Sequence, residues 1–424
     1  MRVDLPNQIV LRWDSDSNCS PLLSAGGIDT VWLQKPDERI ASDCRAAGAE
    51  VLGADAIRLV GRDEDGAPPP GGLVALKAGQ WPGARASARG ADGSFSAGAS
   101  QRAWVDADGY LVAWSKAFYP RRAPVLGYLP DSQAGIGKDQ IVTYESLELA
   151  LIDAWAAGGN YLLAPDAAYR NALGRGEAAA TAAWSQLGRT ARFLKENLSL
   201  FRQPPLSTIT VVVEPEEACA EIAALLFRHS GSPELVSSRS VPAPNASRTP
   251  IVVAAGIGAP PAELGKLLLA HASGGATLIV DAGDGSSWWK APGIKPERQF
   301  ADRGFYTLGA GRVLVYKEAI LDPGDFALDV LDLAASRRPV RLWDASAAIG
   351  MVSQAGAGAK PVLMVVNYGS SSRGEIMAHV RGIHNSATLM RPGEAPVKLR
   401  TCRRGENTEI LLPGFKRLAV VVFG

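Results

Sequence analysis

The pattern of apolar runs changes character twice along the chain, and this feature constrains the fold more than any other. Over about the first 200 residues, apolar runs alternate with helical or polar stretches, which is typical of parallel βαβ units. A second βαβ series begins near Leu206, after a double proline. From about Pro339, short alternating runs follow one another between Gly, Pro and Asn turns. These changes predict three domains, at residues 1–203, 204–338 and 339–424.

The first segment carries about eight strand signals but only about five convincing helices. A helix is predicted over residues 145–157, with an amphipathic pattern closed by two glycines. We therefore expect a (β/α)8-like barrel in which loops replace several helices. The clearest predicted strands cover residues 9–13, 30–33, 56–60, 73–78, 124–129 and 161–164.

The middle segment has the alternation of a doubly wound, flavodoxin-like α/β domain. Its strands are predicted at residues 208–213, 250–255 and 276–281, with helices over residues 216–229 and 261–273. The last segment reads differently, because its short runs alternate with a period of two and are joined by turns. This pattern predicts a small antiparallel β-sandwich.

Composition excludes several classes of function. The formal net charge is +1 and basic residues form no long stripe, so we expect no nucleic-acid partner. No stretch approaches the roughly 18 apolar residues of a membrane span, and no membrane partner is expected. The chain has no phosphate-binding loop and no dinucleotide-binding glycine motif, so no cofactor is predicted. The first residues lack a signal-peptide core, which predicts either a cytoplasmic protein or a secreted or periplasmic one whose signal was removed.

The four cysteines and four histidines do not cluster, so no metal site is predicted. Cys19 and Cys44 are expected on or near consecutive barrel helices. They form a disulfide if the protein is exported, or remain two buried thiols. The second interpretation is the ordinary one for cysteines in a packed domain.

Carboxylates at strand ends are the candidates for chemistry. Hydrolysis of a glycosidic bond uses two carboxyl groups, about 5 Å apart for retention or about 6.5–9.5 Å apart for inversion. In barrels, catalytic side chains lie at the carboxyl ends of strands. The predicted catalytic residues are Asp14, Asp131 and Glu145, with residues 141–144 before Glu145 as a further barrel strand. Each acid also has a structural interpretation, and Glu145 in particular opens a helix, where the dipole stabilises a carboxylate.

Aromatic side chains near the same strand ends are candidates for sugar binding, because sugars present flat C–H faces to aromatic rings. Trp13 and Trp81 lie at a strand end and in a loop, and with Asp106 they form the predicted substrate-binding set. Trp155 and Trp184 lie within predicted helices and are expected in the core.

The order of domains resembles that of the family 42 β-galactosidases, which have a barrel, an amidotransferase-like α/β domain and a β-sandwich. Local support comes from residues 11–14 (Leu-Arg-Trp-Asp) and residues 126–131 (Leu-Gly-Tyr-Leu-Pro-Asp). The run 142–146 (Val-Thr-Tyr-Glu-Ser) is a second acidic segment. The family's Asn-Glu pair after strand four is missing, and residues 79–81 (Gly-Gln-Trp) stand near that place instead.

The resemblance implies a glycoside hydrolase that acts on an oligosaccharide substrate by carboxylate acid/base chemistry. It also implies that the middle domain serves assembly, since Cys219 lies inside a predicted helix and not on a catalytic turn. A homo-oligomer through this domain is therefore expected. The alternative is a catalytically degenerate carbohydrate-binding or scaffold protein on the same fold.

Overall fold

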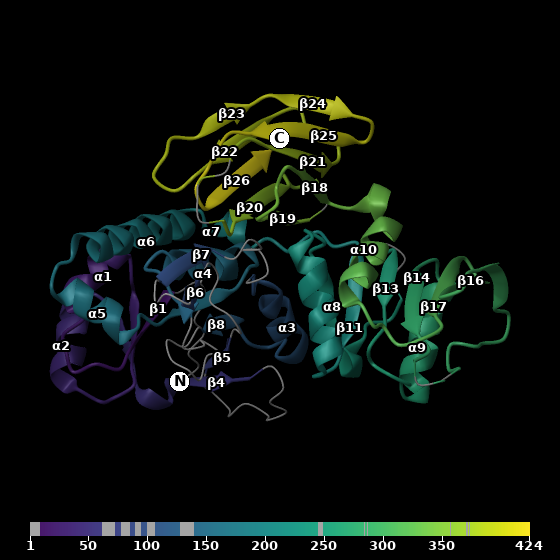
Figure 1. The fold of residues 1–424 in the computed structure, drawn as a ribbon, viewed down its shortest axis with the longest axis horizontal. Helices are drawn as coiled ribbons and strands as arrows, with labels where there is room; N and C mark the ends of the chain where they lie inside the picture. The colour runs from purple at the N-terminus through teal and green to yellow at the C-terminus, as the bar shows by residue number, and fades with distance from the viewer. Residues whose placement is uncertain are drawn as a thin grey trace. The chain divides into compact units, whose positions relative to one another are not determined.

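The computed structural model describes residues 9–61, 73–77, 85–89, 95–99, 107–127, 140–244, 249–283, 285, 287–356, 358–369, 372 and 374–424. These residues form two compact units (Figure 1). The first comprises Met1–Pro204 together with Leu342–Gly424, and the second comprises Pro205–Arg341. The segments that we predicted as separate barrel and sandwich domains thus share one compact unit. We retain the three-domain division as a proposal.

The N-terminal segment is built on a parallel sheet of seven strands. The strands follow one another around the sheet in chain order, and the last pairs with the first through Ile9 and Tyr161. This order is that of a singly wound barrel, which confirms the predicted class. Among the described residues the sheet is open between β3 and β4. The strands are β1 (Ile9–Trp13), β2 (Thr30–Leu33), β3 (Glu50–Leu52), β4 (Ile57–Val60), β5 (Leu73–Lys77), β8 (Val125–Gly127) and β10 (Asn160–Leu163).

The described residues of this segment contain seven helices, one fewer than a full eightfold barrel. They are α1 (Ser20–Gly26), α2 (Glu38–Ala46), α3 (Tyr110–Phe118), α4 (Ser146–Ala156), α5 (Ala167–Gly174), α6 (Ala178–Glu196) and α7 (Leu198–Phe201). Trp155 on α4 and Trp184 on α6 are buried, as predicted. The reduced set of helices agrees with the expectation that loops replace several of them.

Helix α4 differs from its prediction, because every one of its residues is buried. It packs against β10 and α6, and also against the C-terminal sandwich. Its two acidic side chains accept hydrogen bonds from distant parts of the chain: Glu148 from Thr190, and Asp153 from Tyr368. The predicted amphipathic pattern is therefore wrong, since those acids face partners inside the protein and not water.

A small antiparallel sheet accompanies the barrel. It consists of β7 (Phe95–Ala99), β6 (Arg85–Arg89) and β9 (Gln140–Ile141), and β9 pairs with β6. The prediction that residues 141–144 form a further barrel strand is wrong. Only the first of them is in a strand, and that strand belongs to the antiparallel sheet.

The second unit is a mixed sheet with helices. Its five parallel strands, numbered along the chain, have the order 2-1-3-4-5, which is the flavodoxin-like arrangement. Two antiparallel strands extend one edge. The elements are β11 (Ile209–Val213), α8 (Glu217–Arg228), β12 (Glu234–Ser237), β13 (Ile251–Val253), α9 (Ala262–Ser273), β14 (Thr277–Asp281), β15 (Lys295–Gln299), β16 (Arg303–Leu308), β17 (Gly311–Tyr316) and α10 (Pro323–Leu333).

The C-terminal segment consists of two antiparallel sheets, which confirms the predicted sandwich. On β21 and β25 buried residues, all apolar except Thr408, alternate with outward-facing side chains. One sheet has the order β18 (Val340–Trp343), β21 (Ile376–Arg381), β25 (Asn407–Leu412) and β24 (Thr401–Arg404). The other has the order β19 (Ala348–Ser353), β20 (Val362–Asn367), β26 (Leu418–Phe423), β22 (Ala387–Met390) and β23 (Val397–Leu399).

Candidate active site

The barrel core shows which side of each strand faces the interior. One buried residue from each of the seven strands belongs to a single cluster, and alternate residues of a strand point to the same side. On β1, Val10 belongs to this cluster, so Arg12 and then Asp14 continue on the interior side toward the carboxyl end. The cluster consists of Val10, Trp32, Leu52, Ile57, Ala75, Val125 and Leu162.

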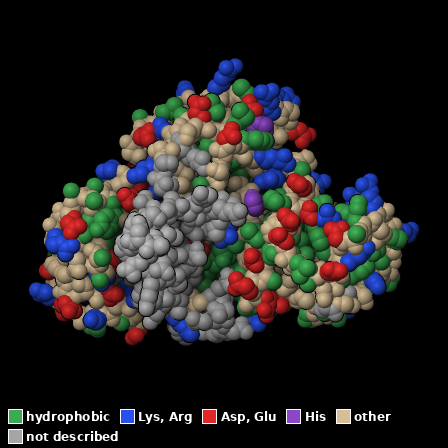
Figure 2. All heavy atoms as spheres, in the orientation of Figure 1, with side chains coloured by type: hydrophobic (Ala, Val, Ile, Leu, Met, Phe, Trp, Pro, Cys, Tyr) green, Lys and Arg blue, Asp and Glu red, His purple; other side chains and the backbone are tan. Residues whose placement is uncertain are grey.

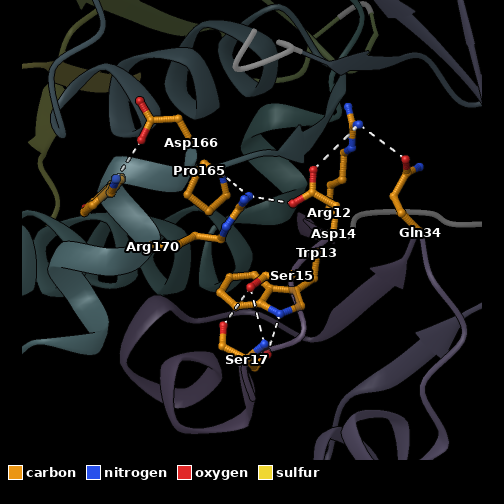
Figure 3. Close-up of polar contacts among 10 residues, drawn as sticks. Arg12, Trp13, Asp14, Ser15, Ser17, Gln34, Pro165, Asp166 and Arg170 are labelled. Carbon is orange, nitrogen blue, oxygen red and sulfur yellow. Dashed lines mark hydrogen bonds and ion pairs between the residues drawn. The ribbon is translucent and has the colours of Figure 1, made fainter.

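Asp14 lies between two guanidinium groups (Figure 3). Its carboxylate is 2.6 Å from Arg170 Nη1 and 4.0 Å from Arg12 Nη2. Arg170 comes from helix α5 and also donates to the carbonyl of Pro165 at 2.9 Å. Strand β1 and the segment after β10 therefore meet at Asp14, as expected for neighbouring parallel strands whose carboxyl ends lie at the same edge.

Arg12 has donors that the described part of the chain does not use. Its Nη2 donates to Gln34 Oε1 at 3.3 Å, and its guanidinium lies 5.9 Å from the centre of the Trp32 ring. Its Nε and Nη1 are buried without a hydrogen-bond partner among the described residues. Buried donors are normally satisfied, so these two nitrogens at a barrel mouth, which carry three N–H groups, are suited to oxygen acceptors of a ligand.

Trp13 occupies the other side of β1. Its side chain is 2% exposed, its indole N–H donates to the carbonyl of Ser17 at 2.7 Å, and Arg170 lies over its ring at 5.6 Å. We predicted that Trp13 stacks against a sugar, but its side chain is buried and offers no free face for stacking. The ring packs against the residues that follow β1, since its N–H is bonded to the carbonyl of Ser17.

Glu145 is exposed and immediately precedes helix α4, with no hydrogen bond from its side chain to the helix end. The neighbouring Tyr144 stacks on Tyr169 of α5, with ring centres 4.3 Å apart. Burial raises the pKa of Tyr169, and the charge of Glu145 raises it further. Glu145 thus raises the pKa of Tyr169, and Asp14 forms an ion pair with the next residue of α5, Arg170.

Three predicted site residues, Asp131, Trp81 and Asp106, lie outside the described residues. Asp166 immediately precedes α5 and caps it, because its carboxylate accepts the backbone N–H of Tyr169 at 2.6 Å. Sequence reasoning missed Arg12 and Arg170. The signal for Arg12 was its spacing of two from Asp14 on a strand, which puts both on one face.

Within the described ranges there is no group of three or more His, Cys, Asp or Glu side chains that could hold a metal ion. No helix in this part of the chain is long and apolar enough to cross a membrane. Cys19 and Cys44 are buried free thiols whose sulfurs lie 3.5 Å apart. Cys19 immediately precedes α1, and Cys44 lies in α2.

In the second unit, Cys219 lies within α8 and is fully buried. Burial raises the pKa of its thiol to about 11, and the sulfur contacts the carbonyl of Gly256 at 3.4 Å. A nucleophilic cysteine needs a lowered pKa and an accessible sulfur. Cys219 has neither, so it serves packing.

The solved structures most informative for this arrangement are glycosidases. A β-galactosidase from Bacillus circulans sp. alkalophilus matches with a TM-score of 0.58 at 8% identity, covering 99% of this chain and 99% of that one. A GH42 β-galactosidase from G. stearothermophilus matches with a TM-score of 0.54 at 8% identity, covering 99% and 98%. These likenesses show that the chain has a GH42-like fold.

A further glycosidase of known structure is similar to this chain. An α-L-fucosidase isoenzyme 2 from Paenibacillus thiaminolyticus matches with a TM-score of 0.51 at 10% identity, covering 100% of this chain and 78% of that one. No family model matches the chain, and neither does any curated protein sequence. At this level of identity the GH42-like layout establishes the fold, while the chemistry depends on the residues at the barrel mouth.

Proposed function

We propose that this protein is a glycoside hydrolase that acts on an oligosaccharide. The observation that carries the proposal is the position of Asp14. Its carboxylate lies at the carboxyl end of β1, on the interior side of the barrel, between Arg12 and Arg170. This is the end of a barrel at which catalytic residues lie, and the GH42-like layout provides the matching fold.

The roles follow from the surroundings of each acid. A carboxylate between two guanidiniums suits a nucleophile or a stabiliser of positive charge, because the ion pair with Arg170 and the nearby Arg12 favour its charged form. In this proposal Asp14 has that role, and Arg12 donates to sugar hydroxyl oxygens through Nε and Nη1. The proton donor is one of the other two predicted acids, Asp131 or Glu145. Glu145 is exposed and free of an ion pair among the described residues.

A second candidate function is carbohydrate binding without catalysis. The direct Arg170–Asp14 contact favours it, because an ion pair of this kind also explains the acid as a structural group. The position of Glu145 favours it as well, since a carboxylate at a helix start is stabilised by the dipole alone. In this case the protein binds an oligosaccharide at the barrel mouth and leaves it intact.

The two candidates separate in a screen of nitrophenyl glycosides with the purified protein. The hydrolase releases nitrophenol from at least one glycoside, and Asp131→Asn or Glu145→Gln lowers that turnover by about 10²–10⁴-fold, whichever acid donates the proton. Glu38→Gln is the matched control, because Glu38 is an exposed acid on α2 that pairs with Arg45 and not with a residue of the predicted site. Binding of glycosides without release of nitrophenol supports the second function.

The middle unit is proposed to serve assembly. It keeps the complete flavodoxin-like order, while its one cysteine, Cys219, is buried in a helix. An assembly role predicts a homo-oligomer in solution. Light scattering at micromolar concentration tests this, and a monomer at all concentrations contradicts it.

A further inference from the structure

The outer face of the sheet β18-β21-β25-β24 carries an ordered row of side chains across its four strands. On β21 and β25 every second residue is buried against the other sheet, and the residues between them point outward. His379 and Glu409 are directly paired outward residues of the two central strands. Trp343 on β18 and Arg404 on β24 extend the row to both edges.

Each member of the row contacts the next. The rings of Trp343 and His379 have centres 4.0 Å apart. His379 Nε2 lies 2.8 Å from Glu409 Oε2, and Arg404 Nε lies 3.3 Å from the same oxygen. The hydrogen bond from His379, with the help of Arg404, lowers the pKa of the Glu409 carboxyl. The polar groups are therefore fixed in orientation before any ligand arrives.

Two exposed apolar residues lie beside this row on the same face of the sheet. Met377 and Leu411 are paired across the two central strands, two residues from His379 and Glu409, and so lie on the same face. They are 39% and 47% exposed, and the Trp343 side chain is 39% exposed. An exposed indole beside oriented polar groups is typical of a small-ligand site, because the ring binds a flat apolar surface while the polar groups set orientation.

We propose that this face binds a neutral oligosaccharide, with one sugar ring against Trp343 and its hydroxyl groups bonded to Glu409 and Arg404. A sugar offers both the C–H surface and the vicinal hydroxyls that such a row requires. The proposal concerns the sandwich alone and does not depend on catalysis in the barrel.

Other occupants fit less well. Glu409 stands at the centre of the row beside Arg404 and balances its charge, which disfavours an anionic ligand. Figure 2 shows both acidic and basic side chains over the C-terminal sandwich. Protein interfaces are depleted of acidic residues at their centre and use about 20–30 residues a side. Three exposed apolar side chains around a central carboxylate do not match that description.

The test is a glycan array of neutral oligosaccharides probed with the full chain carrying Asp14→Asn, so that turnover at the barrel does not consume the ligand. We expect binding to at least one glycan. Adding Trp343→Ala weakens that binding by at least about tenfold, as for a central tryptophan of a binding site. Trp343→Phe retains most of the affinity because it keeps an aromatic face, and Glu409→Gln weakens it.

Ile383→Ala is the matched control, since Ile383 is an exposed apolar residue of the sandwich outside this row, 47% exposed. It leaves binding unchanged. Circular dichroism and the melting temperature establish that each variant is folded, and Glu409→Gln supplies the test if Trp343→Ala does not fold. The proposal is overturned if no neutral glycan binds, if binding is unchanged in the folded Trp343→Ala and Glu409→Gln variants, or if Trp343→Ala abolishes only self-association measured by light scattering.

Discussion

A buried carboxylate on α4 joins three parts of the first unit, and its removal gives the sharpest test of the packing. Asp153 is fully buried and accepts the backbone N–H groups of Asp108 and Gly109 at 2.8 and 3.1 Å. It also accepts the hydroxyl of Tyr368, from the loop after β20, at 2.5 Å. The same side chain thus holds the start of α3 and a residue of the sandwich, 215 positions away in the sequence.

The expected costs follow from these contacts. A hydrogen bond to a charged group contributes about 1.5–3 kcal/mol, so Tyr368→Phe lowers the free energy of unfolding of this unit by about that amount. Asp153→Asn lowers it by about 3–5 kcal/mol, because the amide turns an N–H donor toward groups that are themselves donors and all of them remain buried. The double variant costs less than the sum of the two, since both remove the same bond.

Guanidinium denaturation followed by circular dichroism measures these differences, with the loss of structure analysed separately for each unit. Tyr306→Phe is the control, because Tyr306 is a partly buried tyrosine of the second unit whose hydroxyl has no hydrogen bond within the described residues. A Tyr368→Phe variant as stable as Tyr306→Phe, or strictly additive effects in the double variant, refutes the reasoning.

Two further predictions concern close packing and charge. Gly188→Ala on α6 destabilises the first unit by about 2 kcal/mol or more in thermal unfolding, because the added Cβ would lie 1.8 Å from the carbonyl oxygen of Ala25. Gly174→Ala is the control and leaves the stability unchanged, since its Cβ meets nothing within 4 Å. Equal melting temperatures of the two variants would refute this prediction. The lowered pKa of Glu409 means that its bond with His379 stabilises the fold above the unfolded carboxyl pKa of 4.5 and that this stability is lost as the pH falls through the lower folded value. The difference in melting temperature between the wild type and Glu409→Gln should therefore shrink between about pH 6 and about pH 3, and a constant difference contradicts the assignment.

Much of the architecture was predictable from local periodicity. The strands before Asp14 and Asp166 and three parallel strands of the middle unit, β11, β13 and β14, follow from apolar runs whose lengths fit buried strands. The direction of Asp14 also follows, since parallel strands bring their carboxyl ends to one edge. The strand β3 was missed, because it contains only Glu50–Leu52 and three residues show no period.

The errors have a common physical cause, which is contact between residues far apart in sequence. The β-branched run at residues 141–144 resembles a barrel strand, yet its first residue pairs with Arg85 of β6. Asp153 looks like the polar side of an amphipathic helix until Tyr368 is placed against it. For Trp13, the alternation of β1 already separates it from Asp14, and a strict application of that alternation would have predicted its burial.

The most direct test of the proposed hydrolase is the turnover of Asp14→Asn on whichever nitrophenyl glycoside the wild type cleaves. The substitution keeps the shape of the side chain and removes the charge that Arg170 contacts at 2.6 Å. The account predicts a loss of kcat/KM of at least about 10³-fold, a melting temperature close to that of the wild type, and unchanged turnover in Glu38→Gln. An Asp14→Asn protein that is folded and as active as the wild type would show that the chemistry does not involve this end of β1, and the proposed site would be wrong.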